Sequence, residues 1–246
     1  MRGMKTLLLA SAAAMIATGA YADEQRKVVK VVNTLDKIYL EEDFDRIVID
    51  VVDTIDTKFQ VDQLNRGAVS AHAGTWVSNV TDYSATAAAI ANNASVDVKG
   101  NAGGDNWQGN WGDTTATLNT DIQGAWGKTE LTAVAIGNNF NLNVQDYGGA
   151  VFSSRQVNDG AISAHLNANV TGEINDVSTT AVAIGNNLAV QTAGSTLIGG
   201  VEQVNNGDVT ATNNTVLRPV QRAVDPAIAA AIGNNISITN YIPKVQ

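Results

Sequence analysis

The sequence predicts an all-β protein, a β-solenoid of about eight short coils built from four double repeats of about 47 residues. Two interleaved motifs carry this prediction. An Ile-Gly-Asn-Asn line, or a close variant, occurs at residues 87–98, 132–144, 180–192 and 229–239. A second line, Q-x-N-x-G-x-x-x-A, starts at Gln63, Gln108, Gln156 and Gln203. Short runs of alternating apolar residues around both motifs indicate strands rather than helices.

The first 22 residues are typical of a secretory signal peptide. Arg2 and Lys5 give a positive start, an apolar stretch follows at residues 7–17, and Ala-Tyr-Ala at residues 20–22 forms a small-x-small cleavage site. We therefore expect an exported protein whose mature chain begins at Asp23, on the outer surface of a bacterium or outside it.

Residues 23–61 differ from the repeats because they are richer in basic residues. The β-branched runs "KVVKVV" at residues 27–32 and "RIVIDVVDTI" at residues 46–55 predict strands. Terminal units of a repeat stack are atypical, so this segment is interpreted as an N-terminal cap. A targeting segment for an export or anchoring partner is the alternative.

The repeats occupy residues 62–240, in four units that begin near residues 62, 107, 155 and 202. Each unit is divided into a Gln-type half and an Ile-type half of about 23 residues, and each half is expected to form strand, corner and strand, one coil of the solenoid. In the Ile-type half, Val134 and Ile136 share one face before a Gly-Asn-Asn corner. Phe140, Leu142 and Val144 share one face after it.

Equivalent residues of stacked coils form rows, and neighbouring residues within a row lie about 4.8 Å apart. Rows of Asn and Gln can bond amide to amide, and aliphatic rows form a dry core. The stacking and assembly residues predicted from the first motif are Gln63, Asn65, Gly67, Ala71, Gln108, Asn110, Gly112, Ala116, Gln156, Asn158, Gly160, Ala164, Gln203, Asn205, Gly207 and Ala211. Those predicted from the second motif are Asn92, Asn93, Asn138, Asn139, Asn186, Asn187, Asn234 and Asn235. Gly and Asn are expected there because they tolerate positive φ at corners.

The three prolines, Pro219, Pro226 and Pro243, all lie in or after the last unit. Proline removes a ladder donor and suits an edge, so a loop is expected around residues 217–226, followed by a tail at residues 241–246.

Composition and charge exclude several classes of function. The chain has no Cys, which rules out disulfides and Cys-based metal centres. Its net charge of −9 argues against nucleic acid as a partner. No catalytic set, metal site or cofactor is predicted. His72 and His165, and likewise Asp82 and Asp176, occupy equivalent positions about four coils apart, too far to share one ion.

Three of the four tryptophans, Trp107, Trp111 and Trp126, fall in one Gly-rich unit. Aromatic rings on loops can stack on sugars or pack against a partner, so these residues form a candidate ligand-binding group. The alternative is that they cover the edge of the solenoid.

The Q-x-N-x-G-x-x-x-A line resembles the strand-turn-strand repeats of curlin, the subunit of bacterial curli fibres, although here Asn precedes Gly. The interleaved double unit is also similar to secreted surface proteins that anchor adhesive holdfasts in stalked bacteria. Either resemblance implies a cell-surface structural or adhesive role.

The sequence therefore favours a non-enzymatic structural subunit or anchor of an extracellular adhesive fibre. Its partners would be further copies of itself, other surface or fibre subunits, an outer-membrane export channel, or extracellular polysaccharide. A monomeric surface solenoid that binds polysaccharide through the tryptophans is the alternative, and a polysaccharide-active β-helix enzyme is third.

Overall fold

A computed structural model describes residues 26–32, 57–145, 148–193, 197–218 and 227–240, and every element in these ranges is a β-strand. The prediction of an all-β fold with stacked parallel strands is confirmed. Residues 1–22, the predicted strand at 46–55, the three prolines and the tail at 241–246 lie outside the described residues. None of the described residues belongs to a helix that is long and apolar enough to cross a membrane.

The chain winds through four coils, and each coil uses one complete double repeat. The first coil comprises β2 (Thr57–Asn65), β3 (Val69–Val80) and β4 (Tyr83–Lys99). The second comprises β5 (Ala102–Asn110) and β6 (Thr114–Gln145), and the third β7 (Ala150–Asn158) and β8 (Ile162–Thr192). The fourth comprises β9 (Leu197–Asn205), β10 (Val209–Arg218) and β11 (Ile228–Asn240).

The prediction of about eight coils is therefore wrong by a factor of two. Gln63 pairs directly with Gln108, and Gln108 pairs with Gln156. The Gln-type and Ile-type halves lie on opposite sides of one coil and do not stack on each other. The alternation and spacing of residues in the sequence do not distinguish eight coils of one half-repeat from four coils of one double repeat. Both arrangements place like residues in rows.

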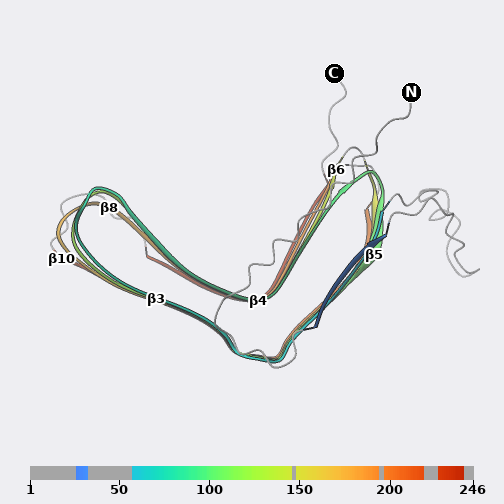
Figure 1. Ribbon diagram of the computed structural model, residues 1–246, viewed down its shortest axis with the longest axis horizontal. Coiled ribbons are helices and arrows are strands. Elements are labelled where there is room, and N and C mark those ends of the chain that lie inside the picture. Colours follow the sequence, from blue (N-terminus) through green and yellow to red (C-terminus); the bar gives the residue numbers. More distant parts are fainter. Residues whose placement is uncertain (1–25, 33–56, 146–147, 194–196, 219–226, 241–246) are drawn as a thin grey trace, which may run out of the picture.

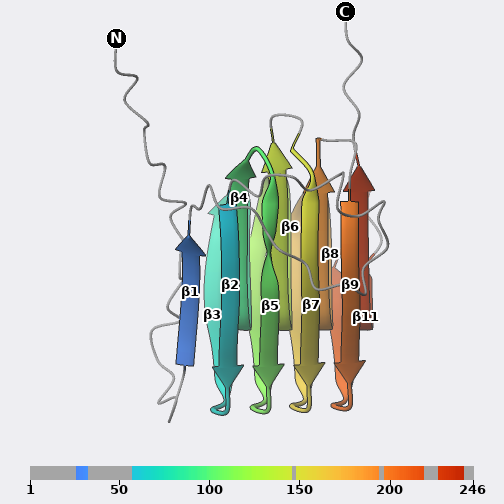
Figure 2. The same cartoon turned by 90° about the vertical axis from the view of Figure 1, so that its right-hand side faces the viewer.

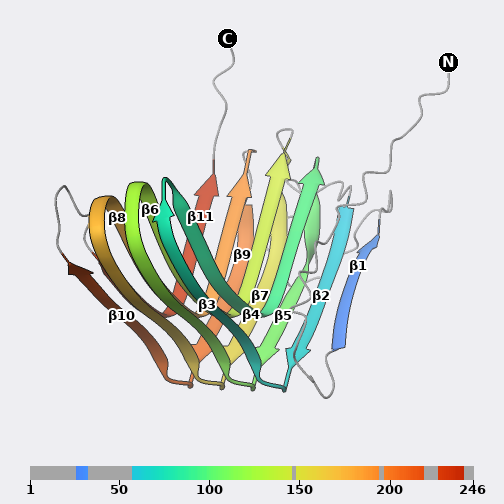
Figure 3. The ribbon, with the colours of Figure 1, turned by 60° about the vertical axis from the view of Figure 1, so that its left-hand side comes forward.

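Two sheets run along the stack, as Figures 2 and 3 show from two sides. The short strands form a five-stranded sheet in the order β1-β2-β5-β7-β9. The long strands form a six-stranded sheet in the order β10-β8-β6-β3, in which β4 pairs with β6 and β11 pairs with β8. All repeat strands pair in parallel, whereas β1 (Arg26–Val32) pairs antiparallel with β2.

Viewed along the stack, the coils superimpose on a bent outline with two arms (Figure 1). One arm encloses a core rich in alanine, with Leu118, Ile122 and Leu166 among its larger members. The other arm encloses a second core that includes Phe59, Phe140 and Leu142 and lies against the short-strand sheet. The rings of Phe59 and Phe140 lie 6.0 Å apart.

The Gly-Asn-Asn motif does not end a strand, because β6 runs unbroken through residues 137–139. Instead it changes which alternate residues point inward. Before the motif the buried residues are Ala133 and Ala135, and after it Phe140 and Leu142 are buried. Val134 and Ile136 do share one face, but this face points outward and is half-buried. The inward positions are occupied by alanines, which are small enough to let the walls of this arm approach closely.

Candidate functional site

A layer of stacked amides lies at the bend, between the two cores. We call it the amide layer, and it consists of four rows: Gln63–Gln108–Gln156–Gln203, Asn65–Asn110–Asn158–Asn205, Asn92–Asn138–Asn186–Asn234 and Asn93–Asn139–Asn187–Asn235. Every step within the first row is a side-chain hydrogen bond of 2.6 or 2.7 Å. The steps of the Asn rows measure 2.6 to 2.8 Å.

The amide layer also joins the two sheets. Gln108 donates from Nε2 to the backbone oxygen of Asn139 at 2.9 Å. Asn138 donates from Nδ2 to the backbone oxygen of Val157 at 2.8 Å. Each inner amide of the rows that begin at Gln63 and Asn92 is therefore bonded both along the stack and across it, which satisfies polar groups that would be costly to bury unpaired.

The rows have opposite directions. In the rows that begin at Asn65 and Asn92, each amide N–H donates toward the C-terminal coil. In the rows that begin at Gln63 and Asn93, each N–H donates toward the N-terminal coil. Each end of the stack therefore presents both donors and acceptors, and the pattern at one end complements the pattern at the other.

The glycine of the first motif allows close approach between coils. A Cβ on Gly160 would lie 2.1 Å from the backbone oxygen of Gly112, and one on Gly112 would lie 2.0 Å from that of Gly67. The expected reason, positive φ, is wrong for these residues. Among the described residues, positive φ occurs at Gly100, Gly124 and Gly172 and at one non-glycine, Asn79.

The alanines of the first motif belong to the alanine-rich core. Ala116 and Ala164 are fully buried, whereas Ala71 and Ala211, in the first and last coils, are half-buried. The structure thus brings the predicted stacking residues into rows within one molecule. Their role between molecules stays a prediction.

The fourth coil forms the C-terminal end of the stack, and it exposes side chains that are buried elsewhere. Ile236 and Ile238 are 50% and 48% exposed, while their row neighbours Leu188 and Val190 are buried. The Oε1 atom of Gln203 is buried, yet it has no hydrogen-bond partner among the described residues. No described strand pairs with the outer edges of β9, β10 and β11. This end therefore resembles the interior of the stack with one layer removed.

The N-terminal end differs because β1 occupies the outer edge of β2. In the long-strand sheet, β3 and β4 each pair only with β6 among the described strands. The Oδ1 atom of Asn92, at the start of its row, is buried without a partner among the described residues. If the row that ends at Asn234 continued into a second copy of the chain, this oxygen would accept its next hydrogen bond.

The three tryptophans predicted to bind a ligand do not form one site. The rings of Trp107 and Trp111 are 5.9 Å apart and cover the backbone of Gly109. Trp126 lies within β6, and residues 114–125 of that strand separate it from Trp111. Sequence reasoning passed over Trp76, which at 63% is the most exposed large apolar side chain of the described residues.

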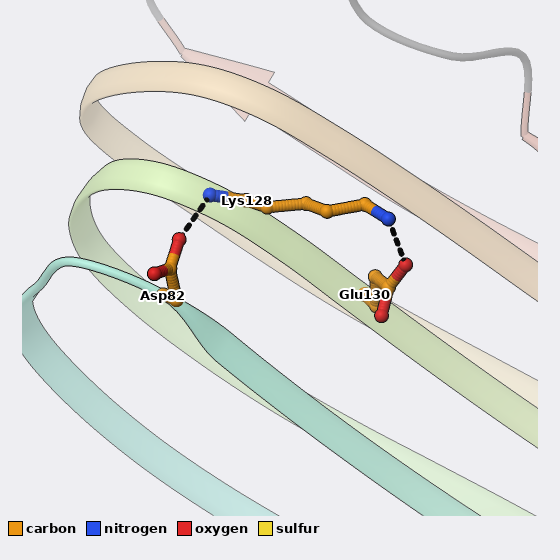
Figure 4. Close-up of polar contacts among 3 residues, drawn as sticks. All are labelled: Asp82, Lys128 and Glu130. Carbon is orange, nitrogen blue, oxygen red and sulfur yellow. Dashed lines mark hydrogen bonds and ion pairs between the residues drawn. The ribbon is translucent and has the colours of Figure 1, made fainter.

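Among the described residues, no three or more His, Cys, Asp or Glu side chains gather into a group that could hold a metal ion. His72 and His165 lie two coils apart rather than the expected four, at a distance of about 10 Å and with Thr117 between them. Asp82 accepts a 2.7 Å hydrogen bond from the backbone N–H of Lys128 in the next coil (Figure 4). Asp176 lies beside Lys128 on the other side. Asp82 thus bonds to the next coil, and it lies two coils away from Asp176.

Comparison with known protein families gives a match over the C-terminal part of the chain. A family model described as holdfast attachment protein D matches residues 96–246. No curated protein and no solved structure matches the chain. The match supports the resemblance to holdfast-anchoring surface proteins, a family of attachment proteins rather than enzymes, while the likeness to curlin stays a prediction.

Proposed function

The chain belongs to the holdfast attachment protein D family, and we propose that it is an exported, non-enzymatic structural component of an adhesive attachment at the cell surface. Its C-terminal end accepts a further β-coil from a second copy of the chain. The observation that carries this proposal is the exposed fourth coil, where a buried amide oxygen of Gln203 has no partner among the described residues and two core isoleucines are about half exposed.

A ladder of strands continues most favourably with its own repeat. An added coil would supply an N–H to Gln203 Oε1 and would cover Ile236 and Ile238. Covering an exposed aliphatic side chain contributes on the order of 1 kcal/mol, and an unpaired sheet edge is a template for a further strand. The first coil has the matching row members, so copies would join head to tail.

We further propose that residues 23–61 form a cap. The antiparallel pairing of β1 with β2 supports this, because it occupies one strand edge that a parallel coil would use. Growth at that end would require β1 to leave β2. Deletion of residues 23–32 is then expected to shorten the lag of assembly, measured as thioflavin T fluorescence over time on the mature chain. An unchanged or longer lag would contradict the cap.

The test of assembly uses two neighbouring substitutions on β11. Ile238→Lys places a charge on the inward face at the open end, where a further coil would have to bury it. Ser237→Lys, the matched control, places the same charge on the exposed outward face. We expect seeded thioflavin T growth for the wild type and for Ser237→Lys, and none for Ile238→Lys. Equal growth of the two variants, or no growth of the wild type with seeds, would overturn the proposal.

A further inference from the structure

A shallow groove of about 690 Å³ lies on the outer face of the long-strand sheet. Its lining residues come from β3, β6, β8 and β10, strands that Figure 3 shows side by side. We call it the outer groove. Its outward-facing lining comes from two rows, one residue per coil. The first row is Gly74, Asn119, Asn167 and Asn214, and the second is Trp76, Asp121, Asn169 and Val216.

The outer groove combines an aromatic platform with ordered amides. Trp76 is 63% exposed at one end, and Val216 is 43% exposed at the other. Between them, Asn167 donates to Asn119 Oδ1 at 2.9 Å and accepts from Asn214 Nδ2 at 3.0 Å. Asn169 donates to Asp121 Oδ1 at 3.3 Å. An amide has two N–H donors and an oxygen with two lone pairs, so Asn167 keeps one donor and one acceptor site for a ligand.

We propose that the outer groove binds an extended, uncharged polysaccharide chain that runs parallel to the stack axis. The apolar face of a pyranose ring stacks on an indole, and ring hydroxyls pair with planar amide and carboxylate groups. The coils place one amide about every 4.8 Å, close to the advance of one ring in an extended sugar chain, so the groove seats about three rings. Trp76 supplies the platform, and Asn119, Asn167 and Asn169 supply the hydrogen bonds.

Two other classes of ligand fit the outer groove less well. Nucleic acids and other polyanions require basic side chains, and the lining has none, while it carries the carboxylate of Asp121. An extended peptide is usually bound at a free strand edge, but this lining lies on the face of a sheet whose strands are already paired. A neutral polysaccharide matches both the charge and the geometry.

The inference rests on the proposed function only for the source of the ligand, an adhesive matrix around the cell. It also adds a consequence for assembly. Head-to-tail addition of a second copy would place its Trp76 beside Val216 of the first, in the same row, so the outer groove would continue across the junction. Binding to many grooves in series would then raise avidity without any new contact.

The experiment is isothermal titration of the freshly purified, unassembled chain with cellohexaose, chitohexaose and xylohexaose, and with polygalacturonate as the anionic control. At least one neutral oligosaccharide is expected to bind and polygalacturonate is not. Trp76→Ala is expected to weaken binding by about tenfold or more, whereas Trp126→Ala leaves it unchanged. Asn167→Ala is expected to weaken it severalfold, and Asn141→Ala, an outward row residue beyond the groove, serves as its matched control.

Absence of binding by all three neutral oligosaccharides would overturn the inference. So would equal losses for Trp76→Ala and Trp126→Ala, provided that circular dichroism shows both variants to be folded. Because binding is measured before assembly, its failure is distinct from a failure of the assembly test. The same titration on Ile238→Lys, which we expect not to assemble, should give wild-type affinity.

Discussion

The second and fourth coils carry equivalent residues in different surroundings. Phe140 of the second coil is fully buried, whereas Ile236, two coils further in the same row, is 50% exposed. Asn138 is fully buried, and Asn234 at the end of its row is exposed. Each coil of a repeat protein is therefore stabilised mainly by the coils on either side of it. The last coil is like an interior coil that lacks one of these two neighbours.

The largest expected effect is a charge within the amide layer. Asn138→Asp would remove the donors to Asn186 Oδ1 and Val157 O and would bury a carboxylate against these oxygens. We expect the free energy of unfolding to fall by about 4 kcal/mol. Asn234→Asp, at the exposed end, should cost less than about 1 kcal/mol. Urea unfolding followed by circular dichroism measures both, and similar losses would contradict the contrast between the coils.

The next effect concerns the core that contains Phe140. Phe140→Ala removes a fully buried ring next to Phe59 and should cost about 3 to 4 kcal/mol through lost burial and a cavity. Ile236→Ala removes a half-exposed side chain from the same row and should cost about 1 kcal/mol. Thermal and urea unfolding of the two variants compare them. A larger cost for Ile236→Ala would show that the fourth coil is covered in solution.

A smaller effect is expected at the glycines that let coils approach. Gly160→Ala places a Cβ 2.1 Å from the backbone oxygen of Gly112, so the coils must shift, at a cost of about 2 kcal/mol. Gly200→Ala on β9 is the control, because a Cβ there meets nothing within 4 Å. Its free energy of unfolding should change by less than about 0.5 kcal/mol. Equal losses in a urea titration would refute the role of close approach.

The smallest effect is expected at the turn shown in Figure 4. Lys128 forms an ion pair with Glu130, and both side chains are at least half exposed. Glu130→Ala should therefore change the free energy of unfolding by about 0.5 kcal/mol or less. The salt dependence of unfolding should also be unchanged in this variant. A loss above about 1 kcal/mol would indicate that this turn is stabilised by charge.

Several features of the fold could be predicted from the sequence. Identical residues at a fixed spacing stack in rows, where amides bond to amides and apolar side chains cover one another. The amide rows and the apolar run Phe140-x-Leu142-x-Val144 are of this kind. The number of coils did not follow, since alternation does not reveal whether two half-repeats stack or face each other. The inward turn of Ala133 and Ala135 was missed for a related reason. Their larger neighbours Val134 and Ile136 dominate any hydrophobicity pattern, although it is the two alanines that point into the core of this arm.

The outer groove could not be predicted because one of its two rows, the row of Trp76, does not repeat. The row of Trp76 continues as Asp121, Asn169 and Val216, four different chemistries at one position. Repeat analysis detects what coils share, while a binding surface on a solenoid arises from what differs between them. Trp76 would have been found only by placing the outward residues of all coils side by side.

The most direct test of head-to-tail assembly is a disulfide across the junction. Asp97 and Thr239 occupy the same outward row in the first and fourth coils, about 14 Å apart within one molecule, which is too far for a bond. In a head-to-tail stack, Thr239 of one copy lies next to Asp97 of the following copy. The chain has no native cysteine, so the double variant Asp97→Cys/Thr239→Cys provides a clean background. After mild oxidation of assembled protein, we expect a ladder of reducible oligomers on a non-reducing gel, with no ladder from either single variant. A double variant that stays monomeric, or dimers from Thr239→Cys alone, would contradict the account.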